Sequence, residues 1–84
     1  MDQLKALRYF CEVAETASFT QTAKRFAVPP SSISRRIAAL EENLSATLLK
    51  RSTRTVQLTE IGETYYHQVK DILYQLEQCD GAVR

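Results

Sequence analysis

Apolar residues near the start of the chain recur every three or four positions, a spacing that predicts an amphipathic helix. The apolar positions are Leu4, Leu7, Phe10, Cys11 and Ala14. Asp2 precedes them and can serve as the N-cap, because its carboxylate can accept a hydrogen bond from a free amide of the first turn. Tyr9 lies beside the apolar stripe, so we expect its side chain to be partly exposed.

A second, shorter helix is predicted to begin at Phe19. Ser18 followed three residues later by Gln21 forms a capping-box pattern, in which each side chain bonds a free backbone amide of the other residue. One face of this helix carries Phe19, Thr22, Ala23 and Phe26. The prolines at positions 29 and 30 end it, because proline disfavours the helical conformation in the residue before it.

A third helix is predicted over residues 30–44, since proline suits the first position of a helix. Its apolar side chains share one face and are Ile33, Ile37, Leu40 and Leu44. The opposite face is polar, basic and low in relief, and its residues are Ser31, Ser32, Ser34, Arg35 and Arg36. Ser31 and Arg35 point most directly away from the core.

The second and third helices, joined by a tight corner, have the layout of a helix-turn-helix. A helix projected from such a corner can lie in the DNA major groove with its N-terminal residues nearest the base edges. The alternative is an ordinary solvated helix face, because serine and arginine are common on protein surfaces. The residues that follow favour the first interpretation.

A small two-stranded hairpin is predicted over residues 48–58, because Thr55 to Leu58 alternate β-branched or apolar residues with polar ones. Arg51 and Arg54 lie near its tip. A basic hairpin beside a reading helix can contact the phosphate backbone or place arginine in the narrow minor groove. The alternative is an edge strand whose charges prevent aggregation.

The longest predicted helix follows Thr59, an N-cap with two glutamates in the next turn, and continues to about Asp80 without proline. Its apolar residues step by four, three, four and three, and they are Tyr65, Val69, Ile72, Leu76 and Cys79. A second stripe lies beside them at Ile61, Tyr66 and Leu73. Such a helix can pack on its own domain with one stripe and on a second subunit with the other, although core packing alone would also explain the pattern.

The net charge of +1 hides an uneven distribution along the chain. Residues 24–57 contain seven basic and two acidic residues, which gives this segment a net charge of +5. The flanking segments, 1–23 and 58–84, have net charges of −1 and −3. The basic segment coincides with the predicted corner, reading helix and hairpin, as expected of a nucleic-acid-binding surface.

Several other classes of function find no support in the sequence. Cys11, Cys79 and the single histidine, His67, do not have the spacing of a zinc site, and we expect both cysteines to pack as small apolar residues. No set of acid, base and nucleophile suggests an enzyme. No signal peptide or membrane-length apolar run is present, so we expect a cytoplasmic protein of one domain.

Taken together, these features resemble the N-terminal domain of LysR-type transcriptional regulators. The matching positions are Ser18, Phe19, Thr20, Ala23, Ile33, Ser34, Arg35, Ile37, Leu40, Glu41, Leu48, Arg51, Leu58, Thr59 and Gly62. The resemblance covers essentially the whole chain. It implies a mainly α fold in which residues 1–59 form a winged helix-turn-helix domain, with the helix-turn-helix at about 18–37 and the wing at about 48–58. Residues 60–84 would form a linker helix that makes a homodimer through Tyr65, Val69, Ile72, Leu76 and Cys79.

The resemblance also implies double-stranded DNA as the partner and no cofactor within this fragment. The expected DNA contacts are Ser18, Thr20, Gln21, Pro30, Ser31, Ser32, Ser34, Arg35, Arg36, Arg51, Thr53 and Arg54. Family members are several times longer, so we expect a DNA-binding fragment that lacks a C-terminal domain for a small-molecule effector. The full-length protein could also assemble into a tetramer.

The chain departs from the family pattern at the start of the reading helix. Pro29, Pro30 and Ser31 stand where serine, glutamine and proline are usual, so one expected base-reading side chain is missing. Ser45 replaces the usual glycine and Leu49 the usual phenylalanine, both of which are tolerable packing changes. We therefore expect a different base preference. The competing interpretation is a winged-helix module that binds an acidic protein partner and no DNA.

Overall fold

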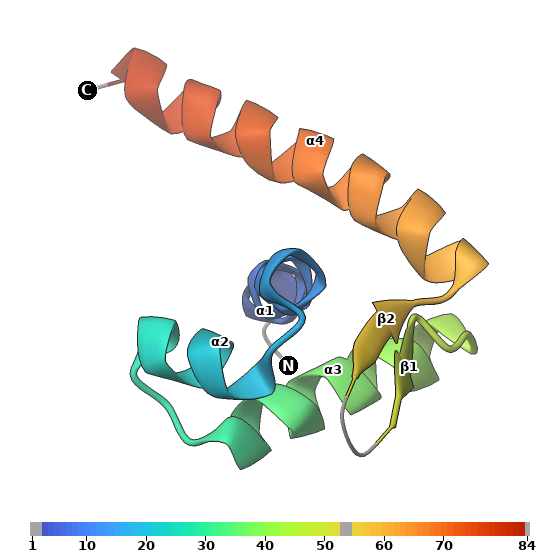
Figure 1. Ribbon diagram of the computed structural model, residues 1–84. Coiled ribbons are helices and arrows are strands. Elements are labelled where there is room, and N and C mark those ends of the chain that lie inside the picture. The colour runs from blue at the N-terminus through green and yellow to red at the C-terminus, as the bar shows by residue number, and fades with distance from the viewer. Residues whose placement is uncertain (1–2, 53–54, 84) are drawn as a thin grey trace.

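The computed structural model describes residues 3–52 and 55–83, in which four helices surround one core and a two-stranded hairpin lies at its edge (Figure 1). The elements are α1 (Gln3–Thr16), α2 (Phe19–Phe26), α3 (Pro30–Leu44), β1 (Leu49–Arg51), β2 (Val56–Leu58) and α4 (Glu60–Val83). This order confirms the predicted mainly α winged helix-turn-helix followed by a long helix. No described helix is long and apolar enough to cross a membrane.

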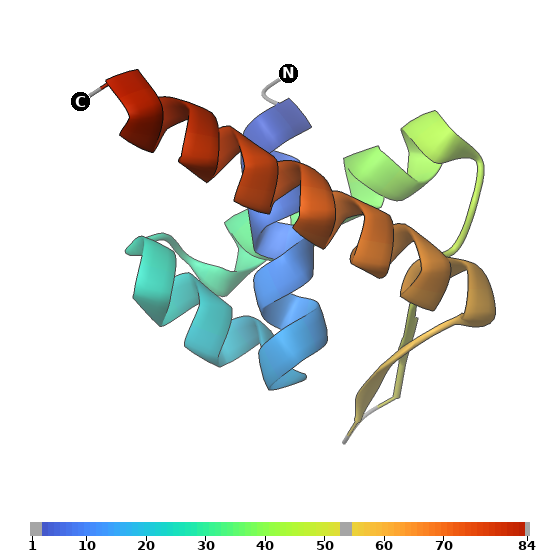
Figure 2. The ribbon, with the colours of Figure 1, turned by 90° about the horizontal axis from the view of Figure 1, so that it is seen from above.

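Helix α1 lies at the centre of the molecule, with α2 and α3 below it and α4 crossing above it (Figures 1 and 2). Phe10 and Val13 are fully buried, as the apolar spacing predicts for Phe10. Tyr9 is only 3% exposed, so the prediction of partial exposure is wrong. Its ring packs edge-on against Phe26 of α2, with the ring centroids 4.9 Å apart. Leu4, by contrast, is largely exposed, because the stripe runs past the edge of the core.

Ser18 caps α2 as predicted, since its hydroxyl oxygen accepts a hydrogen bond from the Gln21 amide at 3.0 Å. The reciprocal half of the capping box is different. The Ser18 amide donates to the hydroxyl of Thr16 at 3.2 Å, so threonine takes the place expected for the Gln21 side chain. Gln21 is consequently left exposed at the start of the helix.

The corner between α2 and α3 has the predicted extended backbone, with φ −65° and ψ 148° at Pro29. Helix α3 begins at Pro30 and ends at Leu44, and its C-cap Ser45 has a φ of 52°, in the left-handed region where glycine would fit more easily. Ile33, Ile37 and Leu40 are buried in the core, whereas Leu44 is largely exposed. The predicted apolar face therefore ends one turn before the helix does.

The hairpin pairs its strands antiparallel, with Leu49 opposite Leu58 and Arg51 opposite Val56. Leu48 and Leu49 are buried and join the hairpin to the core. A carboxylate oxygen of Glu41 in α3 accepts hydrogen bonds from their two amides, at 2.7 Å and 3.2 Å. The hairpin is thereby tied to the third helix, and the predictions for Thr53 and Arg54 fall outside the described residues.

Thr59 caps α4 as predicted, with its hydroxyl oxygen accepting a hydrogen bond from the Gly62 amide at 2.9 Å. On the side of α4 that faces α1, Val69 is only 2% exposed. Tyr65 packs partly against Phe10, at 5.7 Å between ring centroids. The prediction that Val69 contacts a second subunit is therefore wrong, because its side chain belongs to the core of its own chain.

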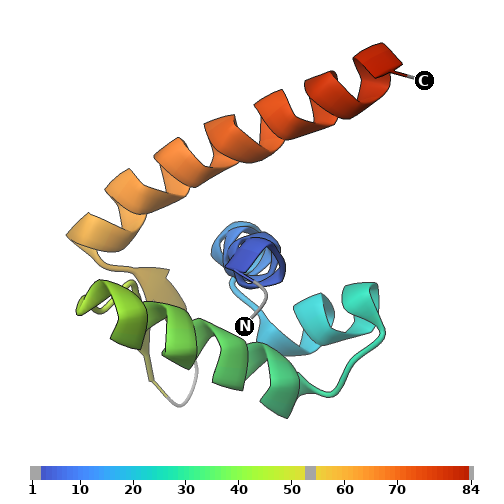
Figure 3. The same ribbon diagram turned by 180° about the vertical axis from the view of Figure 1, so that it is seen from behind.

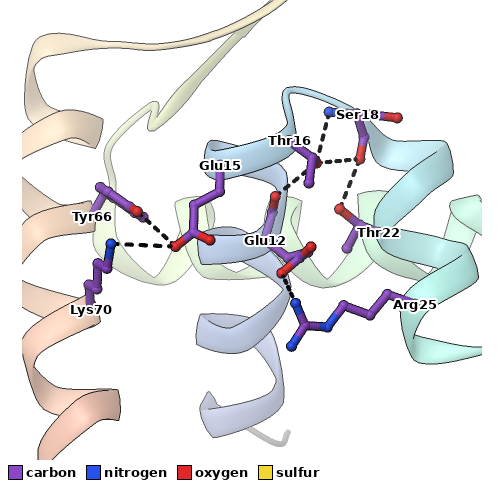
Figure 4. Close-up of polar contacts among 8 residues, drawn as sticks. All are labelled: Glu12, Glu15, Thr16, Ser18, Thr22, Arg25, Tyr66 and Lys70. Carbon is purple, nitrogen blue, oxygen red and sulfur yellow. Dashed lines mark hydrogen bonds and ion pairs between the residues drawn. The ribbon is translucent and has the colours of Figure 1, made fainter.

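Polar contacts also fix α4 on α1 (Figure 4; Figure 3 shows the two helices from behind). The Tyr66 hydroxyl donates to the Glu15 carboxylate at 2.8 Å, and the Lys70 amine lies 4.0 Å from the same oxygen. Cys11 is buried beside this contact, as predicted, and its burial raises the pKa of the thiol to about 11. Cys79 is exposed, which contradicts the expectation that it packs, because α4 extends beyond the core there.

The close approach of α4 to the hairpin gives a test of the fold. A Cβ atom on Gly62 would overlap the carbonyl oxygen of Leu48, so Gly62→Ala should lower the free energy of unfolding by about 1–3 kcal/mol in urea denaturation. Gly81→Ala is the matched control, because nothing lies within 4 Å of a Cβ there. It should leave stability unchanged or raise it by up to about 1 kcal/mol. Equal effects of both substitutions would contradict the close packing.

Candidate nucleic-acid interface

The outer face of α3 is open to solvent along its first two turns. Ser31 and Arg35 are exposed, and Ser32, Ser34 and Arg36 are half-buried along its flanks. The core residues of α3 point the opposite way, as the 3.6-residue period requires. The structure thus gives these five residues the orientation that the sequence predicts, and Pro30 is exposed at the start of the same face.

The beginning of α2 lies beside α3 and adds a second polar surface (Figure 1). Thr20 and Gln21 are exposed there, whereas the Ser18 hydroxyl is occupied as the helix cap. The buried Thr22 hydroxyl donates to the Ser18 carbonyl at 2.8 Å and holds the cap in place (Figure 4). A helix N-terminus of this kind favours anions, because free amides and the helix dipole both point outward.

Arg51 lies across the junction of the wing with both helices. Its Nη1 atom donates to the Ser34 hydroxyl of α3 at 2.7 Å. Its guanidinium carbon lies 4.4 Å from the centroid of the Phe19 ring of α2, a cation–π distance. We call these three residues the Arg51 clamp. They join α2, α3 and the wing at one point.

The sequence placed Arg51 near the wing tip as a DNA contact and did not reveal the clamp. A signal was available, because alternate residues of a strand point to the same side. Leu49 is buried, so Arg51, two residues later, faces the helices as well. Lys50 points the other way and is exposed.

Not all of the basic segment is available to an anionic partner. Arg25 forms an ion pair with Glu12 of α1 at 2.7 Å, which offsets its charge (Figure 4). Among the described residues, the exposed cations of this face include Arg35, Lys50 and Arg51, with Arg36 half-buried beside them. Among the described residues, no group of histidine, cysteine or acidic side chains could hold a metal ion.

Comparison with known proteins identifies similar chains. Residues 4–63 match the family described as bacterial regulatory helix-turn-helix protein, lysR family. The chain is 48% identical over 81 residues to YhjC, an uncharacterized HTH-type transcriptional regulator of Escherichia coli. This match covers 96% of the present chain and 27% of YhjC. The present chain thus spans about a quarter of the length of this curated relative.

Comparison with solved structures also identifies similar chains. The fold matches the BenM DNA-binding domain in complex with catB site 1 DNA, with a TM-score of 0.91 and 35% identity over 95% of this chain and 89% of that one. It also matches full-length CbnR complexed with its target DNA, with a TM-score of 0.88 and 33% identity over 96% of this chain and 28% of that one.

The Arg51 clamp can be tested without any ligand. Because Arg51 and Phe19 are in contact, the effects of Arg51→Lys and Phe19→Leu on the free energy of unfolding should not add, and a double-mutant cycle should give a coupling of about 0.5–1 kcal/mol. The control cycle combines Lys50→Ala with Phe19→Leu, whose effects on the free energy of unfolding should add. Additivity in both cycles would show that the guanidinium does not rest on the ring.

Proposed function

Because the chain belongs to the LysR family of bacterial regulatory helix-turn-helix proteins, we propose that it binds double-stranded DNA sequence-specifically, as the DNA-binding part of a transcriptional regulator. The observation that carries the proposal is the exposed polar and basic face of α3, held between the start of α2 and the wing. The similar proteins are transcriptional regulators rather than enzymes. Regulation by a small-molecule effector stays a prediction.

In this proposal α3 lies in the major groove, since Pro30, Ser31 and Arg35 on its outer side are exposed. Arg35 has the reach and the two-pronged donor needed for the O6 and N7 atoms of guanine. Ser31 and Ser32 are short and would serve bases or nearby phosphates. Pro30 has neither a donor side chain nor an amide hydrogen, so it can offer only apolar contact.

Other groups would position α3 on the DNA by contacts with the phosphate backbone, which do not distinguish one base sequence from another. Thr20 and Gln21 stand at the exposed N-terminus of α2, where free amides favour a phosphate. Lys50 is exposed on the outer side of the wing. These contacts would fix the register of α3 in the groove.

Dimerisation through α4 is the second part of the proposal. At 100° per residue, one set of apolar side chains falls within about 60° on this helix: Ile61, Tyr65, Ile72, Leu76, Cys79 and Val83. Ile61 and Ile72 are 60% and 56% exposed, and Val83 is also exposed. We call this set the open stripe. A second copy of the chain would cover it and place two reading helices on an imperfect palindrome.

The open stripe begins beside a hollow of about 720 Å³ at the N-terminal end of α4. Ile61 and Tyr65 line it together with Thr47 and Gln68. An apolar side chain of the partner helix could enter this hollow, which would remove more apolar surface from water than two flat helix faces could. The predicted dimer contacts Tyr65, Ile72, Leu76 and Cys79 belong to the open stripe, and Val69 does not.

Base reading by Arg35 can be tested by binding measurements on a set of related duplexes. Arg35→Ala should weaken binding to the preferred duplex by about 1–3 kcal/mol and remove the preference at one base pair. Lys70→Ala removes the same charge from α4, on the opposite side of α1, and should leave that preference intact. A protein-interaction module would instead show no duplex binding at moderate salt, whereas DNA binding should fall linearly on logarithmic axes as salt increases.

Pairing through the open stripe can be tested by sedimentation. Ile72→Glu places a charge in the middle of the stripe and should yield monomers, because an unpaired charge is costly in an apolar interface. Tyr74→Glu is the matched control, since Tyr74 is exposed to a similar extent, 61% against 56% for Ile72, but lies on another side of α4. A dimer that survives Ile72→Glu would assign the pairing to another surface.

A further inference from the structure

A groove of about 380 Å³ runs between the first turns of α1 and one flank of α3. It is lined by Lys5 and Tyr9 of α1 and by Ser32, Arg35, Arg36 and Ala39 of α3. We call it the α1–α3 groove. The predicted set of DNA contacts included no residue of α1.

The described side chains that line this groove carry charge of one sign. Among the described residues that line it, three are cations and none is a carboxylate. A second hollow continues from it along α1 and adds Arg8. By contrast, the hollow between α1, α2 and α4 mixes Glu12, Glu15 and Glu77 with its basic residues. The α1–α3 groove therefore favours an anion, with a serine hydroxyl beside the two arginines.

The groove and the wing lie on opposite flanks of α3. At 100° per residue, Ser34 and Arg36 differ by about 200° around the helix. The Ser34 flank is covered by Arg51 and Phe19, whereas the Arg36 flank faces Lys5. Figure 3 shows the start of α1 on the near side of α3 and the hairpin behind it, and Figure 2 places them at opposite edges.

A helix lying in the major groove is bordered by the phosphates of both strands, which are about 12 Å apart across that groove. The start of α2 and the wing meet at the Arg51 clamp on one flank of α3, so in this proposal they serve one of these two backbones. We propose that the α1–α3 groove binds a phosphate of the other backbone, with Lys5 and Arg36 as its cations. This inference rests on the proposed function, and it adds Lys5 of α1 to the DNA contacts.

Binding measurements as a function of salt test the contribution of Lys5. Loss of one phosphate contact should lower the salt slope of log affinity by about 0.9. For Lys5→Ala this corresponds to an affinity about threefold to tenfold weaker at 0.15 M salt, equally for preferred and random duplexes. Lys5→Arg should restore both quantities. Lys70→Ala, which removes the same charge from α4, should change neither.

Lys5 is exposed, so its substitution should change the stability of the chain by no more than about 0.5 kcal/mol in thermal unfolding, and Lys5→Gln provides a variant of similar side-chain length. Neutral methylphosphonate linkages, placed one at a time in the duplex, locate the contact. The wild-type chain should lose affinity at linkages on both strands that border α3. The two uncharged variants should lose this sensitivity on one strand only, the strand away from the wing.

The outcomes separate the two proposals. If Lys5→Ala keeps the wild-type affinity, slope and sensitivity on both strands, the groove does not bind phosphate, although DNA binding stands. If Lys70→Ala lowers the affinity and the salt slope as much as Lys5→Ala does, phosphate binding at the groove is likewise ruled out, because the loss of net charge would then explain both effects. If the wild-type chain shows no salt-dependent duplex binding at all, the proposed function itself is wrong.

Discussion

The burial of α1 on several sides is the constraint on which the rest of the structure depends. Its buried residues do not lie along one narrow stripe, because α2 and α3 pack on one side and α4 on the other. They are Ala6, Leu7, Tyr9, Phe10, Cys11 and Val13. A chain of 84 residues can bury only a modest core, so each helix must share the central one. Helix α3 can then use a single face for stability and keep its remaining surface for a partner.

Short-range contacts then determine how this surface is presented. The direction of α3 is set at its start by the extended Pro29 and at its end by the left-handed Ser45, both of which are local backbone conformations. Glu41 ties the hairpin to the same helix through two backbone amides, and Arg51 ties it again through Ser34. Two of the elements that we assign to DNA are thus held as one unit before any ligand arrives, which lowers the entropic cost of binding.

The sequence predicts the features that depend on neighbouring residues. Ser18, Pro30 and Thr59 mark helix starts because capping and proline geometry act within one turn, and the structure confirms all three. Tyr9 and Val69 were misplaced, and the contacts of Arg51 were missed, because their environment comes from elements distant in the chain. Tyr9 is covered by α2 and Val69 by the core beneath α4, and Arg51 contacts one residue in each of two helices. The groove beside Lys5 was missed for the same reason, since it exists only when α1 packs on α3.

Helix α4 continues past the body of the domain, and residues 77–83 are exposed throughout. Its 24 residues span about 36 Å as one unbroken rod, with the Tyr66 and Lys70 contacts to Glu15 near its middle. Because these contacts bind α4 to α1, a change in the direction of α4 changes the orientation of the rest of the domain as well. In the proposed dimer, a tilt of the exposed end of α4 would therefore change the separation of the two α3 helices, and hence the half-site spacing that they fit, without a change in any residue of the surface that we assign to DNA.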